Sequence, residues 1–350
     1  MAQAERSLRE AERMCRTILP EVSRTFALSI RCLPGELGRA VLAGYLLCRI
    51  ADTVEDDPAA TPERKTELFQ AFILCFDDTA AADAYPRTAI ELAGAAHDVH
   101  LVQYSDCVFQ VYRSLPLAAQ AAIKEWVHEM VRGMQSFVQR YPGGIRIQTL
   151  GEYREYCYYV AGTVGHLLTE LWRELAPGIG RATYTALRDR CVSFGEALQT
   201  VNILKDIAWD AERENAIYIP SDTLSAHGSG HGTLLSPEHL ARNRAALDPF
   251  VELAEAGLAD ALEYVLLVPK RAFPVRVFCA LPVLFAYATT RDLARSTAML
   301  HAGGGVKISR REVKALMLLG PLAVASDYGF RRLVERVGRA PLTLIPSFIS

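Results

Sequence analysis

Apolar residues recur at the three- and four-residue spacing of an amphipathic α-helix along almost the entire chain. The strict alternation of apolar and polar residues that is typical of a half-buried strand does not stand out anywhere. We expect helices over residues 35–57, 62–76, 115–141, 149–176, 179–210, 237–267, 270–300 and 309–336. The pattern predicts an all-α protein. Because neither a repeat nor a linker interrupts it, we expect a single domain over residues 1–350.

Two of the expected helices are largely apolar and yet each carries one polar stripe. The first stripe consists of Tyr45, Arg49, Asp52 and Asp56, and the second of Gln199, Asn202, Asp206 and Asp210. Spacings of three and four residues place the members of a stripe on one helix face. Same-face carboxylates repel each other, and a carboxylate on a buried helix has to be paired or bound to metal. The stripes therefore favour a divalent-metal site over an ordinary solvated helix face, and carboxylate oxygens suit Mg²⁺.

Composition and charge narrow the class of protein. The chain is 51% hydrophobic with a net charge of −2, so it can bury a large core and lacks the basic excess typical of nucleic-acid binding. Its eight cysteines form no Cys-x-x-Cys pair, as in a reduced cytosolic core. The N-terminus lacks the apolar region of a signal peptide. No apolar run approaches the ~18 residues of a membrane span, and 315–325 is the best. We expect a cytoplasmic protein, at most peripheral to a membrane.

Two glycine-rich segments leave alternatives open. The stretch 227–232 contains His227 and His231, whose spacing in such a loop fixes no metal geometry, so a mobile surface loop is favoured over a metal site. Three consecutive glycines, 303–305, precede Lys307 and are interpreted from the residues alone as a plain connection between helices. No Gly-x-Gly-x-x-Gly motif follows a strand, which argues against a Rossmann-type cofactor site.

The motifs around the stripes resemble those of the squalene/phytoene synthase family. Residues 23–26, 45–57, 156–165 and 199–210 resemble its opening, first aspartate-rich, central tyrosine and second metal motifs, in that order. Residues 278–282 and 306–310 resemble two segments of the squalene synthases within that family, and the second of them helps to hold a nicotinamide cofactor. The resemblance extends from Ser23 to about Leu316. It implies a single-domain isoprenoid synthase helical bundle with a central active-site cavity.

The resemblance also implies a function, that of a farnesyl-diphosphate farnesyltransferase. Two molecules of farnesyl diphosphate would condense head to head, with Mg²⁺, to presqualene diphosphate, which NADPH would reduce to squalene, a sterol or hopanoid precursor. Val283, Trp209 and Lys205 depart from the family pattern and bear mainly on the reductive step. A synthase without that step, making presqualene diphosphate, dehydrosqualene or phytoene, therefore stays open. So does a helical protein that only binds isoprenoids. We expect no obligate protein partner, and peripheral membrane contact for product release.

The resemblance assigns roles to individual residues. Metal ligands are Asp52, Glu55, Asp56, Asp206 and Asp210; substrate contacts are Ser23, Arg24, Tyr45, Arg49, Gln199, Asn202 and Arg213; NADPH contacts are Arg24, Arg49, Lys205, Lys307 and Arg310. Besides the four aspartates, the catalytic residues are Tyr156, for moving a proton, and Phe278, whose ring face would steady a carbocation. From sequence alone, either aromatic residue is also explained as core packing. Gly162 and Gly165 weaken a helix, which suggests close approach of the prenyl tail.

Overall fold

The computed structural model describes residues 7–342, and these are almost entirely helical. Within them the only strand-like pairing is one isolated parallel bridge between Arg146 and Ile217. The prediction of an all-α fold is confirmed. The chain divides into two compact units, each described here by itself. Unit 1 comprises Met1–Ile145 and His166–Ala176, and unit 2 comprises Arg146–Gly165 and Pro177–Ser350. The expected single domain stays a prediction.

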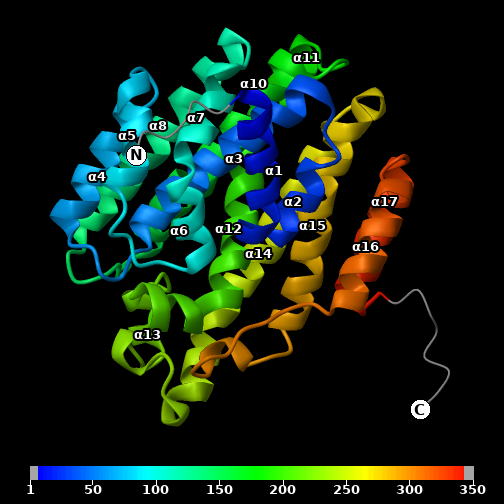
Figure 1. Cartoon of the computed structure of the whole chain (residues 1–350). Coiled ribbons are helices and arrows are strands. Elements are labelled where there is room, and N and C mark those ends of the chain that lie inside the picture. The colour runs from blue at the N-terminus through cyan, green and yellow to red at the C-terminus, as the bar shows by residue number, and fades with distance from the viewer. Residues whose placement is uncertain (1–6, 343–350) are drawn as a thin grey trace. The chain divides into compact units, whose positions relative to one another are not determined.

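Unit 1 is built around a buried helix, α3, which the structure places where an apolar helix was expected. Its helices are α1 (Leu8–Val22), α2 (Arg24–Ile30), α3 (Gly35–Glu55), α4 (Pro62–Leu74), α5 (Thr79–Thr88), α6 (Ala96–Gln103), α7 (Ser105–Arg113), α8 (Leu117–Arg140) and the larger part of α10 (Thr163–Leu175). Helices α6, α7 and α8 all contact α3 (Figure 1). This surrounding explains why α3 is apolar nearly all round.

Unit 2 is built around α12, which contacts α14, α15 and the π-helical turn η1. Its α-helices are α9 (Leu150–Cys157), α11 (Arg181–Arg188), α12 (Cys191–Trp209), α13 (Ser221–Ala226), α14 (Leu240–Leu267), α15 (Phe273–Leu293), α16 (Arg310–Ala323) and α17 (Asp327–Arg339). Two π-helical turns, η1 (Tyr158–Gly162) and η2 (Asp210–Glu214), and the 3₁₀ turns η3 (His231–Thr233), η4 (Pro237–His239), η5 (Lys270–Ala272) and η6 (Ala298–Leu300) complete it. Turns of the π type are frequent at functional sites.

Several element boundaries differ from the sequence prediction. The helices expected at 35–57, 62–76 and 115–141 are α3, α4 and α8, with ends shifted by a few residues. The helices expected at 179–210 and 309–336 are each broken, at 189–190 and 324–326. Helices α5, α6 and α7 were not expected at all. They are short, and tertiary packing rather than a long apolar period stabilises such segments.

The close approach at the glycines is between two segments of the chain itself. A Cβ atom on Gly165 would lie 2.0 Å from the carbonyl oxygen of Cys191, and one on Gly195 would lie 2.1 Å from that of Ala161. At Gly162 a Cβ atom would lie 2.9 Å from the ring of Tyr158 and 3.2 Å from a methyl group of Val192. Our expectation that the prenyl tail requires these glycines is therefore wrong, because the backbone of α12 occupies the space at Gly165 and the side chains of Tyr158 and Val192 occupy it at Gly162.

One helix is more apolar than the sequence analysis recognised. Lys270–Leu293 is long and apolar enough to cross a membrane by length and composition, and 83% of its most apolar window is buried inside the protein. The expectation that 315–325 is the most apolar run is wrong. The charges of Arg276 and Arg291 interrupt the apolar sequence of α15, so its high overall hydropathy was overlooked. Both arginines are buried and paired, Arg276 with the carbonyl oxygens of Val324 and Val268. Such burial is typical of a core helix.

The stretch 227–232 packs onto unit 2 and is largely half-buried. His231 Nε2 lies 2.8 Å from the carbonyl oxygen of Ile219. Ser229 contacts the fully buried side chain of Asn243, which donates hydrogen bonds to the carbonyl oxygens of Thr233 and Leu234. The stretch was expected to be a surface loop, but these hydrogen bonds tie it to α14.

Candidate functional site

The first carboxylate stripe lies at the C-terminal end of α3. The side chain of Asp52 is 28% exposed, whereas Glu55 is buried. Burial raises the pKa of Asp52 to about 7 and that of Asp56 to about 6, although Arg49 acts in the opposite direction. Ionisation of these two carboxylates is thus unfavourable, and a bound cation would stabilise their charged forms.

The donor set fits Mg²⁺. Among residues 7–342, no group of three or more Asp, Glu, His or Cys side chains is arranged to hold a metal. Mg²⁺ does not require such a cage, because it uses one or two carboxylates and completes its octahedron with water and substrate phosphate. The pair Asp52 and Asp56 offers hard oxygen ligands in that number.

Arg49 is held by a residue that the sequence analysis missed. Its Nε and Nη2 atoms donate to the two carboxylate oxygens of Asp98 at 2.9 and 2.7 Å, while its Nη1 lies 3.8 Å from Asp52. Burial acts to lower the pKa of Arg49, but Asp98 and Asp52 outweigh it and raise that pKa. Asp98, buried on α6, therefore keeps the guanidinium charged and directs it away from full pairing with Asp52.

Two predicted substrate contacts meet near the start of α2. Ser23 caps this helix by accepting a hydrogen bond of 3.2 Å from the backbone N–H of Phe26. Tyr45 stacks on the Phe26 ring with centroids 5.5 Å apart. Burial raises the pKa of Tyr45 to about 12, against a hydrogen bond with Ser23 that lowers it. The side chain of Arg24 lies outside what the structure describes.

The third aspartate of the first motif has a structural role. Asp57 is 1% exposed, and its carboxylate accepts hydrogen bonds from the backbone N–H groups of Ala59, Ala60 and Ala93. These bonds shape the turn after α3 and tie it to a distant loop of unit 1. Lys65 donates to the carbonyl oxygen of Glu55, and burial lowers the pKa of Lys65. Asp57 and Lys65 therefore support the end of the stripe.

The second stripe runs along α12 into η2. Asn202 is exposed, the side chain of Asp206 is 32% exposed, and Asp210 is buried at the point where the helix changes to a π turn. Lys205 forms an ion pair with Asp206. Gln199 is half-buried one turn earlier. The structure thus keeps this stripe on one face of α12, with the ammonium group of Lys205 beside the carboxylate of Asp206.

Tyr156 pairs with a second tyrosine that the sequence analysis did not single out. Its hydroxyl donates a hydrogen bond of 3.0 Å to that of Tyr218, and the two rings stack with centroids 4.6 Å apart. Both side chains are buried. Tyr218 also lines a small pocket together with Asp210. The structure therefore brings the predicted proton-moving residue close to the end of the second stripe.

A backbone clip positions Tyr218. Asn215 ends η2 in the left-handed conformation with φ of 53°. Arg146 donates hydrogen bonds of 2.6 Å to the carbonyl oxygen and the side-chain oxygen of Asn215. Ile147 N–H bonds to the carbonyl oxygen of Ile217 at 3.1 Å. These contacts fix the chain on both sides of the turn that leads to Tyr218.

The glycine-rich segment 303–306 is hydrogen-bonded to two residues that neighbour the second stripe in the sequence, Lys205 and Glu212. The N–H of Val306 donates to the carbonyl oxygen of Lys205 at 3.2 Å, and the N–H of Gly303 donates to the carboxylate of Glu212 at 2.9 Å. A Cβ atom on Gly305 would lie 3.2 Å from the Lys205 carbonyl oxygen. The predicted cofactor residues Lys307 and Arg310, both exposed, follow this anchored segment.

The comparisons with known proteins agree with these motifs. The family model for squalene/phytoene synthases matches residues 19–312. The chain belongs to the squalene/phytoene synthase family. The squalene synthase of Bos taurus is 29% identical over 317 residues, which cover 89% of this chain and 70% of that protein. The predictions of the family and of an enzyme are confirmed.

One solved structure supports the same family, and a second shares its fold. The structure of TcSQS with the ligand BPH1237 has a TM-score of 0.76 and 26% identity, covering 94% of this chain and 98% of that one. A dehydrosqualene synthase in complex with a ligand has a TM-score of 0.53 at 18% identity, covering 94% of this chain and 96% of that chain. This second likeness is one of fold alone.

The two remaining predicted residues differ in accessibility. Phe278 is 2% exposed and lies among the core side chains of α15. Arg213 is exposed on η2, with its guanidinium 5.7 Å from the centroid of the Trp209 ring. The role of Phe278 at a carbocation stays a prediction, and so does the substrate contact of Arg213.

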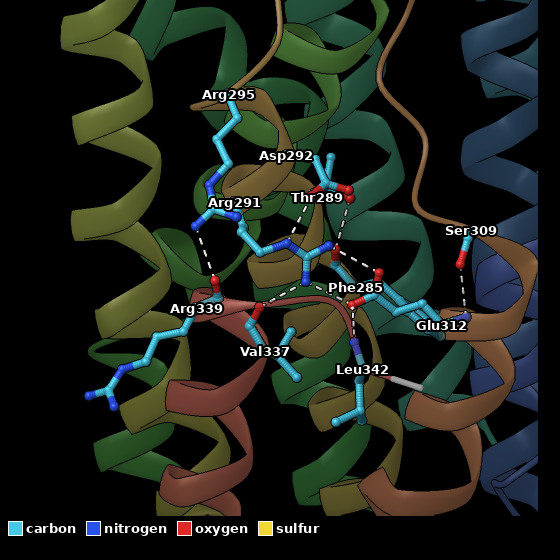
Figure 2. A network of polar contacts seen from close by, with 10 residues as sticks. All are labelled: Phe285, Thr289, Arg291, Asp292, Arg295, Ser309, Glu312, Val337, Arg339 and Leu342. Carbon is cyan, nitrogen blue, oxygen red and sulfur yellow. Dashed lines mark hydrogen bonds and ion pairs between the residues drawn. The ribbon is translucent and has the colours of Figure 1, made fainter. Parts of the chain in front are cut away.

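A buried polar network supports the segment that carries the cofactor residues (Figure 2). Arg291 of α15 and Glu312 of α16 form two hydrogen bonds of 2.7 and 3.0 Å. Glu312 also accepts a hydrogen bond from the N–H of Leu342, and Arg291 donates to the carbonyl oxygen of Val337. Because Ser309 caps α16 by accepting from the N–H of Glu312, the network fixes the start of that helix.

Proposed function

We propose that the protein is a squalene synthase that uses Mg²⁺ and NADPH. It condenses two molecules of farnesyl diphosphate to presqualene diphosphate and then reduces this intermediate to squalene. The observation that carries the proposal is the anchoring of segment 303–306 to Lys205 and Glu212 beside the second carboxylate stripe. This contact supports a cofactor segment that works next to a diphosphate site.

Ionisation of the first farnesyl diphosphate breaks the bond between C1 and oxygen, and the electron pair leaves with pyrophosphate. Asp52 and Asp56 at the C-terminal end of α3 would offer carboxylates to Mg²⁺, with Glu55 as a further ligand. Asp206 on α12 and Asp210 at the start of η2 would offer two more. When bound, Mg²⁺ supplies positive charge to the leaving group. Arg49, Arg24 and Lys205 contribute cationic hydrogen-bond donors where negative charge develops. Ser23, Tyr45, Gln199, Asn202 and Arg213 would orient the substrate diphosphates.

The condensation ends with loss of a proton, when the electrons of a C–H bond close the cyclopropane ring. Tyr156 is the residue that would move this proton, at its phenolic oxygen. Its hydrogen bond to Tyr218 supports this role, because the second hydroxyl fixes the orientation of the first. Burial of both rings keeps bulk water away from the cationic intermediate.

The second step loses the remaining diphosphate and adds a hydride at carbon. When bound, NADPH supplies that hydride. Lys307 and Arg310 would hold its phosphates, since both are exposed cations directly after the anchored segment. Phe278 would face the cation with its ring. The free cysteines support a reducing compartment, and we place the enzyme in the cytoplasm.

The product assay tests this proposal. The purified protein is incubated with farnesyl diphosphate and Mg²⁺, with and without NADPH, and the products are identified by mass spectrometry. We expect presqualene diphosphate without NADPH, squalene with it, and neither when a chelator removes Mg²⁺. Dehydrosqualene or phytoene as the product, or presqualene diphosphate in both samples, would overturn the reductive half of the proposal. The absence of any condensation product would indicate a protein that only binds isoprenoids.

A further inference from the structure

The exposed face of α16 combines basic and apolar side chains in one stripe. Arg311, Lys314, Leu318 and Leu322 follow one another at spacings of three and four residues, which keeps them within about 80° of the helix circumference. Leu318 is 57% exposed and Leu322 is 68% exposed. The first half of this face, which we call the α16 stripe, is therefore cationic, and its second half is apolar.

The charge of this end of the chain differs from that of the rest. Residues 307–339 contain eight Lys and Arg residues and three Asp and Glu residues, a net charge of +5, whereas the whole chain has −2. The remaining residues consequently carry −7. Tyr328, at the start of the neighbouring helix α17, is 73% exposed and adds a large amphipathic ring (Figure 1). Basic charge and exposed apolar side chains thus occur in the same two helices.

We propose that the α16 stripe docks the protein onto the surface of an anionic lipid bilayer. Leu318 and Leu322 enter the boundary between head groups and acyl chains, and Arg311 and Lys314 contact the anionic head groups. A second copy of this chain is a less suitable occupant. A symmetric dimer would bring two regions of net charge +5 together, and such pairing of like charges is unfavourable.

This inference goes beyond the chemistry of the proposed function and does not depend on it. The α16 stripe contains no metal-binding or proton-moving residue, and the buried Glu312 lies outside it on a different face of α16. A bilayer is also the phase into which a C₃₀ hydrocarbon product would partition. Only this link to the product rests on the proposed function.

Vesicle sedimentation tests the proposal. The full chain is mixed with vesicles of phosphatidylcholine, or of phosphatidylcholine with phosphatidylglycerol, at low and high salt. The variants are Leu318→Ser with Leu322→Ser, and Lys314→Glu. Matched controls are Leu74→Ser with Leu117→Ser, which are 61% and 82% exposed in unit 1, and Arg181→Glu on the exposed start of α11. Circular dichroism verifies that every variant is folded.

We expect the protein to sediment with anionic vesicles only, and less at high salt because the attraction is screened. Lys314→Glu should weaken partitioning at least about fivefold and the double leucine variant at least about tenfold, with both controls unchanged. Turnover without lipid should be the same in all variants, which separates this inference from the proposed function. Equal binding to neutral vesicles, no binding, or unchanged partitioning of the stripe variants would overturn it. So would a dimer in solution that the leucine substitutions dissociate without affecting vesicle binding.

Discussion

Replacing Glu312 with alanine removes one half of a buried ion pair and leaves the Arg291 guanidinium with only the partly exposed carboxylate of Asp292, 2.8 Å from its Nε. The two side chains are 2% and 1% exposed and share hydrogen bonds of 2.7 and 3.0 Å, and the N–H of Leu342 loses its acceptor as well. Breaking such a pair from one side costs about 3–5 kcal/mol. Removing both partners, in Arg291→Met with Glu312→Leu, should cost much less, because no buried charge is then left uncompensated.

Urea unfolding followed by circular dichroism measures these differences in the free energy of unfolding. The control is Glu335→Ala, which breaks the exposed pair of Arg332 and Glu335, with side chains 63% and 49% exposed, and should cost below about 0.5 kcal/mol. A loss of less than about 1 kcal/mol in Glu312→Ala, or an equal loss in the double variant, would refute the reasoning about burial. Because Glu312 lies in the first turn of α16, Glu312→Gln should also raise the KM for NADPH more than it lowers kcat.

The remaining predictions concern the proposed chemistry. Asp52→Asn or Asp206→Asn should abolish product formation with an unchanged circular dichroism spectrum; near-normal turnover in either would contradict the metal role of the two stripes. Tyr156→Phe should prevent accumulation of both presqualene diphosphate and squalene, and formation of the intermediate at a comparable rate would exclude proton transfer by this residue. Lys307→Ala should raise the KM for NADPH about 10- to 150-fold, as expected for a lost charge-assisted phosphate contact, and divert product toward presqualene diphosphate; an unchanged KM would identify the segment as a connector. Asp98→Asn should weaken Mg²⁺ binding about tenfold or more in calorimetry, because Arg49 is then free to pair with Asp52; unchanged affinity would show that Asp98 only stabilises the fold.

The faces of the two stripes could be predicted from the sequence because helical spacing determines them. Asp52 and Asp206 lie on partly exposed faces of otherwise apolar helices, as the pattern indicated. The partner of Arg49 could not be predicted, because Asp98 reaches it only through the packing of α6 on α3. Helix α6 itself was not expected, because its region of the sequence has no long helical period of apolar residues. Tyr218 lies only eight residues after Asp210, the end of the second stripe. Its phenol could therefore have been considered, from the sequence, as a second polar group near the site.

The cofactor segment and the helix that carries the second metal stripe are in contact in the structure, although they are far apart in the sequence. Lys307 lies far along the chain from both metal stripes. The hydrogen bond between Val306 and the carbonyl oxygen of Lys205 brings the preceding residue to α12. Substitutions within 303–306 are therefore expected to disturb both half-reactions, whereas a change confined to the Lys307 side chain is expected to affect only the reductive one.

Transfer of deuterium tests most directly the central claim that the protein makes squalene with a hydride from NADPH. The protein is supplied with farnesyl diphosphate, Mg²⁺ and NADPH that carries deuterium at the transferable position of its nicotinamide ring. The account predicts squalene that contains one deuterium atom per molecule, with two farnesyl diphosphates consumed for each. A hydrocarbon without deuterium, or presqualene diphosphate as the final product, would contradict it.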